Sequence, residues 1–200
     1  MFNRKTAPKV RGGRVQKKNR HTPTRLNSFG VGLVRAGSGS RHVTTRQDVW
    51  KFLRFLPEWK RVSTDLDLIY LAAGSYDYDG WYEYPQRPTI ALCAWPDDLI
   101  MRPLTEYYME HRAIFRMLGV SCEPTEHGDM ICQFTEESAR AYQLVHILLH
   151  ELGHHHYRIT EGKGRSAGTE KYAEGYAIRW MHRIWKNYCE QFRFYPQSNA

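Results

Sequence analysis

The chain lacks any stretch of eighteen or more apolar residues, so the sequence offers no candidate for a membrane-spanning helix. Positive charge near the start, at Arg4 and Lys5, is not followed by an apolar segment of the kind found in secretory signals. We therefore expect no secretory leader and no membrane partner. With 200 residues, 42% of them hydrophobic, the chain is long enough to bury one globular core.

Cysteine is scarce, and the four cysteines form no CxxC pair. This spacing argues against a structural zinc ribbon. Cys93 and Cys132 lie in apolar runs, where a free cysteine behaves as a small buried hydrophobic residue. We therefore predict no disulfide bonds and a reducing, cytoplasmic location.

Acidic residues are absent from the first 46 positions, which hold twelve Lys and Arg. The remaining positions hold seventeen Lys and Arg against twenty-one Asp and Glu, so the net charge of +8 comes from this segment alone. Residues 1–42 show neither helical nor strand periodicity, which predicts a disordered basic tail ahead of one domain over residues 43–200. Residues 1–46 are candidates for binding nucleic acid or another polyanion, for docking on a partner protein, or for keeping the chain soluble.

The domain is predicted to mix helices and strands. Thr44 or Thr45 can cap a helix that ends at Pro57, and Pro103 can open another that ends near Gly119. Thr135 can cap a long helix to about Tyr157, and a last helix spans about 169–192. Strands are predicted at 66–73, 89–95 and 130–134, and residues 74–88 are predicted to form a loop.

The long helix carries the motif with the clearest chemistry, His150-Glu151-Leu152-Gly153-His154. Residues four apart on a helix lie about 40° apart around its axis, so His150 and His154 project side by side and can bind one metal ion. Glu151 is poorly placed as a third ligand, but it can take a proton from a metal-bound water. The motif therefore predicts a zinc site with Glu151 as general base.

A catalytic zinc uses three protein ligands, and the last helix offers two candidates for the third, Glu170 and Glu174. These residues are four apart and share a helix face. One can bind the metal, and the other can accept a hydrogen bond from a ligand histidine. The small residues Ala173 and Ala177 would allow this helix to pack closely on the first.

HELGH followed by Glu170-Lys171-Tyr172-Ala173-Glu174 resembles the gluzincin metallopeptidases, and the short spacing resembles the minimal ImmA/IrrE group. The resemblance covers about residues 130–177. It implies that Glu170 is the third zinc ligand and that Glu174, where the related pattern usually has Asp or Asn, supports a ligand histidine. It also implies an α+β, zincin-like domain, in which a small sheet packs on the HExxH helix and the following helix supplies a ligand.

Other side chains near the motif leave alternatives open. His155 and His156 are predicted to face solvent, and His146 is predicted to be a core histidine or one that supports a ligand. A metzincin site needs a third His after His154 at a spacing that this sequence lacks. Candidates for stabilising negative charge in the transition state are Tyr172 and Tyr176, followed by Tyr157 and Arg158. The strands at 89–95 and 130–134 are either interior strands or edge strands that pair with substrate.

These observations predict a metallopeptidase with one zinc ion per chain that hydrolyses a protein or peptide substrate through a water activated by zinc and Glu151. One alternative is a non-catalytic zinc-fold binding module whose basic arm engages nucleic acid or a protein assembly. Another is a zinc hydrolase that acts on a non-peptide amide or ester.

Overall fold

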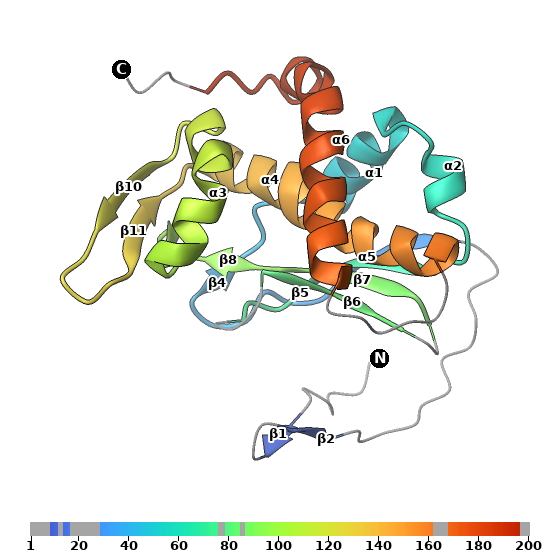
Figure 1. Ribbon diagram of the computed structural model, residues 1–200, viewed down its shortest axis with the longest axis horizontal. Helices are drawn as coiled ribbons and strands as arrows, with labels where there is room; N and C mark the ends of the chain where they lie inside the picture. The colour runs from blue at the N-terminus through green and yellow to red at the C-terminus, as the bar shows by residue number, and fades with distance from the viewer. Residues whose placement is uncertain are drawn as a thin grey trace.

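A four-stranded mixed sheet with the order β3-β5-β7-β6 lies at the centre of the molecule (Figure 1). Strands β3 (Gly30–Leu33), β5 (Leu68–Ala72) and β7 (Thr89–Cys93) are parallel, and β6 (Gly80–Glu83) runs antiparallel to β7 at one edge. All five residues of β7, which lies between β5 and β6, are buried. This computed structural model describes residues 9–11, 14–16, 29–75, 79–84, 87–161 and 168–196, of which 9–11 and 14–16 are described by their backbone only.

Helices cover one face of the sheet and carry the candidate site (Figure 1). A nearly continuous helical segment consists of α4 (Glu136–Tyr142), a π-helical turn η1 (Gln143–Ile147) and α5 (Leu148–Glu161). Helix α5 contacts β6 and β7, and α6 (Gly168–Phe192) packs against both α5 and η1. The fold is therefore α+β, as the sequence predicts.

Smaller elements complete the structure, and their bounds are as follows. The remaining helices are α1 (Arg46–Phe55), α2 (Trp59–Val62) and α3 (Thr105–Met117). A second sheet has the order β10-β11-β9, with β10 (Ser121–Pro124), β11 (Met130–Gln133) and β9 (Ile100–Met101). Two further strand pairs are β1 (Lys9–Arg11) with β2 (Arg14–Gln16), and β4 (Ser40–Arg41) with β8 (Trp95–Pro96).

The predicted helix ends are confirmed where capping chemistry defines them. Thr45 caps α1 in a reciprocal capping box with Asp48, and Thr135 caps α4 in the same way with Ser138. Gly119 follows the end of α3 with a φ of 68°, a left-handed conformation that glycine adopts without strain. Local hydrogen bonding therefore determines these boundaries.

Three predictions about local structure are wrong. The segment 1–42 was expected to contain no strand, yet β3 joins the central sheet and β4 pairs with β8, because partners distant in sequence satisfy their backbone groups. The expected loop 74–88 contains the edge strand β6. The structure also pairs Cys122 with Cys132 in a disulfide across β10 and β11, because the register of these strands sets the two residues opposite each other.

The disulfide removes the cysteine argument for a reducing compartment, so the cytoplasmic location stays a prediction that nothing in the fold supports. Among the described residues, no helix combines the length and the apolar character needed to cross a membrane. Residues 1–8, 12–13 and 17–28 of the basic segment 1–46 lie outside the described residues, and the proposed binding of nucleic acid or another polyanion by this segment stays a prediction.

Candidate metal centre

Three side-chain atoms from α5 and α6 converge in the geometry of a metal site. The Nε2 atoms of His150 and His154 lie 3.2 Å apart, and Glu170 Oε2 lies 3.3 Å from the first and 3.4 Å from the second. In a tetrahedral zinc site with bonds of about 2.05 Å, ligand atoms lie about 3.3–3.4 Å from one another. The spacing of the three atoms therefore matches three corners of such a tetrahedron, and these residues could hold a metal ion.

Glu174 approaches His150 from the opposite side of the imidazole ring. Its Oε2 lies 3.1 Å from His150 Nδ1, and a carboxylate can only accept at this position, so His150 carries its proton on Nδ1. Nε2 then presents a lone pair toward His154 and Glu170. The geometry thus gives Glu170 the position of a ligand and Glu174 the position of a residue that orients one.

Glu151 is buried beside His150, and its pKa is raised toward neutral pH. Its side chain is 7% exposed, and burial raises its pKa to about 7, with the charge of Glu170 acting in the same direction and His150 opposing it. A carboxyl group that titrates near neutral pH can both accept and return a proton. Both Glu151 and His150 line a pocket between α3, α5 and α6.

Close packing between α5 and α6 sets the distance between the ligands on the two helices. A Cβ atom added at Gly153 would lie 2.7 Å from Ala173 Cα and 3.1 Å from Tyr176 Cβ, so the two backbones meet where Gly153 has no side chain. Ala173 and Ala177 are fully buried at this contact, as the sequence predicts. The small residues therefore bring Glu170 and Glu174 within reach of the α5 histidines.

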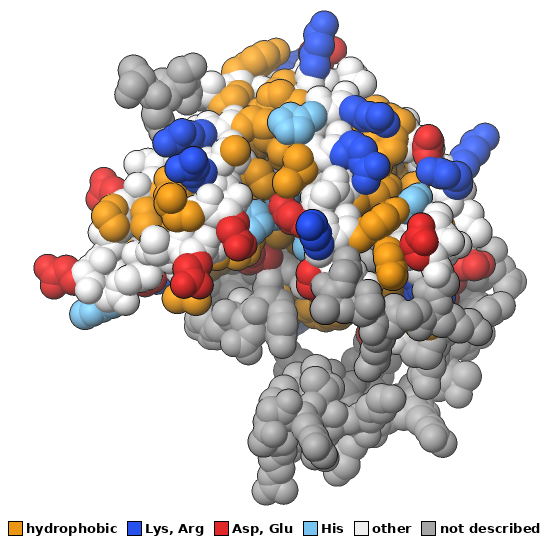
Figure 2. All heavy atoms as spheres, in the orientation of Figure 1, with side chains coloured by type: hydrophobic (Ala, Val, Ile, Leu, Met, Phe, Trp, Pro, Cys, Tyr) orange, Lys and Arg blue, Asp and Glu red, His pale blue; other side chains and the backbone are white. Residues whose placement is uncertain are grey.

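The site opens into a pocket of about 510 Å³ in which carboxylates outnumber positive side chains. Lys171 is the one Lys or Arg side chain that lines it within the described part of the chain. Figure 2 shows acidic and histidine side chains gathered in the hollow between α3 and α6. Such a surface attracts cations. The acidic side chains that line the pocket are Asp79, Glu110, Glu151, Glu170 and Glu174.

The sequence analysis did not anticipate that two elements, α3 and β6, contribute residues to this pocket. Tyr107 and His111 of α3 line it together with the α5 and α6 residues, although no spacing in the sequence relates α3 to the HExxH motif. Gly80 of β6 also lines it, and a Cβ atom there would lie 2.7 Å from Ile147 Cγ2, so the glycine lets the edge strand approach η1 closely. In the sequence, only the spacing of Tyr107 and His111, four residues apart, could have indicated that α3 has a polar face at this position.

The predicted transition-state stabilisers lie outside the pocket lining. The hydroxyl of Tyr172 lies 2.7 Å from His156 Nδ1, and Tyr176 is buried against His156 and Trp180. Tyr157 packs on Tyr172. Arg158 donates to Tyr82 at 2.7 Å and stacks on Tyr84, away from the site.

The prediction that His155 and His156 face solvent is wrong, because neighbouring elements cover this end of α5. His155 is fully buried, with Nε2 2.9 Å from the carbonyl of Thr64 and Nδ1 3.0 Å from the hydroxyl of Tyr82. His156 is 9% exposed and contacts Tyr172. His146 is buried, as predicted, and its Nε2 lies 3.2 Å from both carboxylate oxygens of Glu174.

The two strands weighed as substrate partners are both interior. β7 lies between β5 and β6, and β11 lies between β10 and β9. The edge strand that contacts α5 is β6, which the sequence analysis expected to be part of a loop.

No family model, no curated protein and no solved structure matches this chain.

Proposed function

We propose that this protein is a zinc-dependent metallopeptidase with a zincin-like domain. The observation that carries the proposal is the set of tetrahedral distances among His150 Nε2, His154 Nε2 and Glu170 Oε2, with a buried carboxyl group, Glu151, one residue from the first ligand. The resemblance of the two helical motifs to gluzincins supports the same conclusion. The neutral-range pKa of Glu151 suits a base that works near pH 7.

Each residue of the site has its own role in the proposed reaction. His150, His154 and Glu170 would hold one zinc ion, which when bound lowers the pKa of a coordinated water and polarises a carbonyl group. Glu151 accepts the proton of the attacking water and delivers it to the leaving amine. Glu174 keeps the Nδ1 proton of His150 in place, so that Nε2 stays available as a ligand.

Strand β6 offers a place for an extended substrate. Within the described residues it pairs with β7 alone, so its outer edge has no strand partner. Gly80, at the start of β6, lines the same pocket as His150 and Glu151. A peptide that adds to this edge by backbone hydrogen bonding would lie across the metal centre.

The test compares wild-type protein with Glu151→Gln, both loaded with zinc, on a library of proteome-derived peptides whose new ends are identified by mass spectrometry. We expect wild type to cleave a defined set of sequences. Glu151→Gln should bind zinc as wild type does and cleave about 10²–10⁴-fold more slowly, because the general base is lost while the ligands remain. The matched control is Glu137→Gln, which makes the same change at an exposed position in the first turn of α4.

Zinc-loaded wild type that leaves the library intact, or a Glu151→Gln variant that cleaves as fast as wild type, would contradict the peptidase. A protein that binds zinc, cleaves nothing and hydrolyses small amide or ester substrates would instead indicate the non-peptide hydrolase. Purified wild type that takes up no zinc would contradict the metal centre itself.

A further inference from the structure

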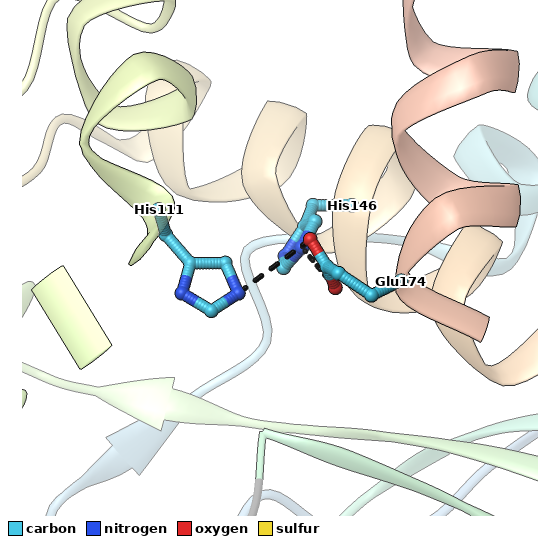
Figure 3. Close-up of side chains that lie close together, drawn as sticks. All are labelled: His111, His146 and Glu174. Carbon is cyan, nitrogen blue, oxygen red and sulfur yellow. Dashed lines mark hydrogen bonds and ion pairs between the residues drawn. The ribbon is translucent and has the colours of Figure 1, made fainter. Parts of the chain in front are cut away.

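A second His-His-Glu group lies beside the proposed zinc centre and is made from three separate elements (Figure 3). His111 comes from α3, His146 from the π-helical turn η1, and Glu174 from α6. Glu174 Oε1 lies 3.2 Å from His146 Nε2 and 3.6 Å from His111 Nε2, and the three ligand atoms all lie within 4.8 Å of one another. These separations leave room for an ion among them.

The hydrogen bonding of His111 leaves its Nε2 facing the group as a ligand atom would. His111 Nδ1 lies 2.8 Å from the carbonyl oxygen of Tyr107, which can only accept, so Nδ1 carries a proton. The ring also stacks on Tyr107, with centroids 4.1 Å apart, and this contact fixes its orientation. A histidine whose Nδ1–H donates to a carbonyl oxygen is a common arrangement for a ligand that binds a metal ion through Nε2. Its Nε2 faces the Glu174 carboxylate, and either a proton or a metal ion can lie between the two.

His146 is brought to the group by an unusual backbone feature. The five-residue π-helical turn interrupts the segment from α4 to α5 at this histidine, and such turns are rare and frequently occur at functional sites. The side chain is 2% exposed, its Nε2 points at Glu174, and its Nδ1 has no hydrogen-bond partner among the described residues. Nε2 is therefore the ring nitrogen of His146 that lies in the group, beside Glu174.

Glu174 supplies the negative charge and joins the two groups. Its Oε2 accepts from His150 Nδ1 at 3.1 Å, and Oε1 is the oxygen nearest His111. The same carboxylate thus lies beside three histidines, His111, His146 and His150. The neighbouring pocket carboxylates Asp79 and Glu110 add further negative charge.

We propose that His111 Nε2, His146 Nε2 and Glu174 Oε1 form a second divalent-metal site, separate from the proposed catalytic one and opening into the same pocket. Two imidazoles and one carboxylate suit zinc and related transition metals. Glu174 would then bind the second ion through one oxygen and orient His150 through the other. The site does not depend on peptidase activity, because it is defined by binding alone.

The test is the zinc stoichiometry of metal-stripped protein, measured by isothermal titration with Zn²⁺ and by elemental analysis after gel filtration in metal-free buffer. We expect two equivalents for wild type, one for His111→Ala and one for His154→Ala, because each substitution removes a ligand from a different group. His111→Phe should also hold one equivalent, since it keeps a ring against Tyr107 but has no nitrogen. It serves as the second variant if His111→Ala does not fold.

The matched control is His182→Ala, which removes an imidazole from an exposed position on α6 and should leave two equivalents. One equivalent in wild type that is lost in His154→Ala and kept in His111→Ala would overturn the second site and leave the proposed catalytic centre intact. One equivalent that is lost in His111→Ala and kept in His154→Ala would support the second site and overturn the catalytic one. Two equivalents in both wild type and His111→Ala would place the second ion elsewhere and overturn the proposal.

Discussion

The two His-His-Glu groups contain the same types of side chain, but the fold brings their residues together in different ways. In the first, His150 and His154 are neighbours on one helix, and the close packing of α5 against α6 adds Glu170. In the second, His111, His146 and Glu174 come from three elements, and a π-helical turn places the middle residue. Helical periodicity alone aligns the two histidines of the first group, whereas the second exists only in the folded chain. We therefore expect the two groups to respond differently to substitution.

Metal removal should have the largest effect and should separate the groups. A ligand that binds only the folded state stabilises it by about 4 kcal/mol when its free concentration is about 1,000-fold above Kd. Chelation of zinc-saturated wild type should therefore lower the free energy of unfolding by about this amount for each occupied site. Urea unfolding with and without zinc measures it. His154→Ala should lose the contribution of the first group, and His111→Ala that of the second. An equal zinc response in all three proteins would contradict both assignments.

His155 differs from the histidines of the two groups because it is buried without a carboxylate partner, and we expect it to make the stability of the protein depend on pH. Its polar contacts are the Thr64 carbonyl and the Tyr82 hydroxyl, and burial lowers its pKa from 6.5 to about 4. Below pH 6.5 the unfolded imidazole takes up a proton that the folded one refuses until about pH 4. The stability of metal-free protein should therefore fall as pH drops through this window, by about 3 kcal/mol from this group. Urea unfolding at pH 7 and pH 4.5 measures the change.

His155→Gln is the comparison for this pH dependence. It should be less stable than wild type at pH 7, because the buried hydrogen bonds are disturbed, but its stability should change less between pH 7 and pH 4.5. The difference in slope should correspond to about one proton. An identical slope in the two proteins would show that His155 titrates normally.

Glu174→Gln should weaken both groups, because one carboxylate serves them both. The variant keeps the size of the side chain but loses the charge. Replacing a residue that orients a metal ligand typically lowers metal affinity about 10–100-fold, and we expect this loss at the first group. The second group should lose its ion altogether. Competition with a zinc-binding dye measures both. The control is Glu110→Gln, a pocket carboxylate outside both groups, which should change the affinity of each group far less.

Gly153→Ala should act on the contact between α5 and α6. The added methyl group meets the backbone of Ala173, so the helices must separate. Overpacking of this kind destabilises by about 1–3 kcal/mol, and the better helix propensity of alanine offsets up to about 1 kcal/mol. Thermal unfolding measures the net loss, and zinc affinity at the first group should fall with it. Gly175→Ala is the matched control, because a Cβ atom there meets nothing within 4 Å.

Thr45→Ala should have the smallest effect and should leave both groups intact. The Thr45 hydroxyl caps α1 in its capping box with Asp48, and loss of such a cap costs about 1 kcal/mol. Urea unfolding should show this loss, while zinc stoichiometry should equal that of wild type. A change in stoichiometry would indicate that metal uptake reports general destabilisation rather than the ligands.

The sequence by itself determined the features that depend on near neighbours. These are the capped starts of α1 and α4, the glycine at the end of α3, the pairing of His150 with His154, and the small residues of α6 that allow close packing. Each follows from hydrogen bonds or helical spacing within a few residues. The proposed roles of Glu170 as a ligand and Glu174 as a residue that orients His150 came from resemblance, and in the structure Glu170 lies beside the Nε2 atoms of both histidines while Glu174 lies beside His150 Nδ1.

Only the tertiary structure decided the rest, because the partners concerned are distant in sequence. Residues 30–33 become a strand through pairing with β5, and His155 becomes a core residue through Thr64 and Tyr82, although a histidine near a helix end suggests exposure. His111 reaches Glu174 across 63 positions of the chain, and no periodicity records that contact. Helical geometry within a few residues therefore sets the positions of His150 and His154 in the first group. Packing between elements distant in sequence places Glu170 beside them and brings His111 and His146 to Glu174 in the second group.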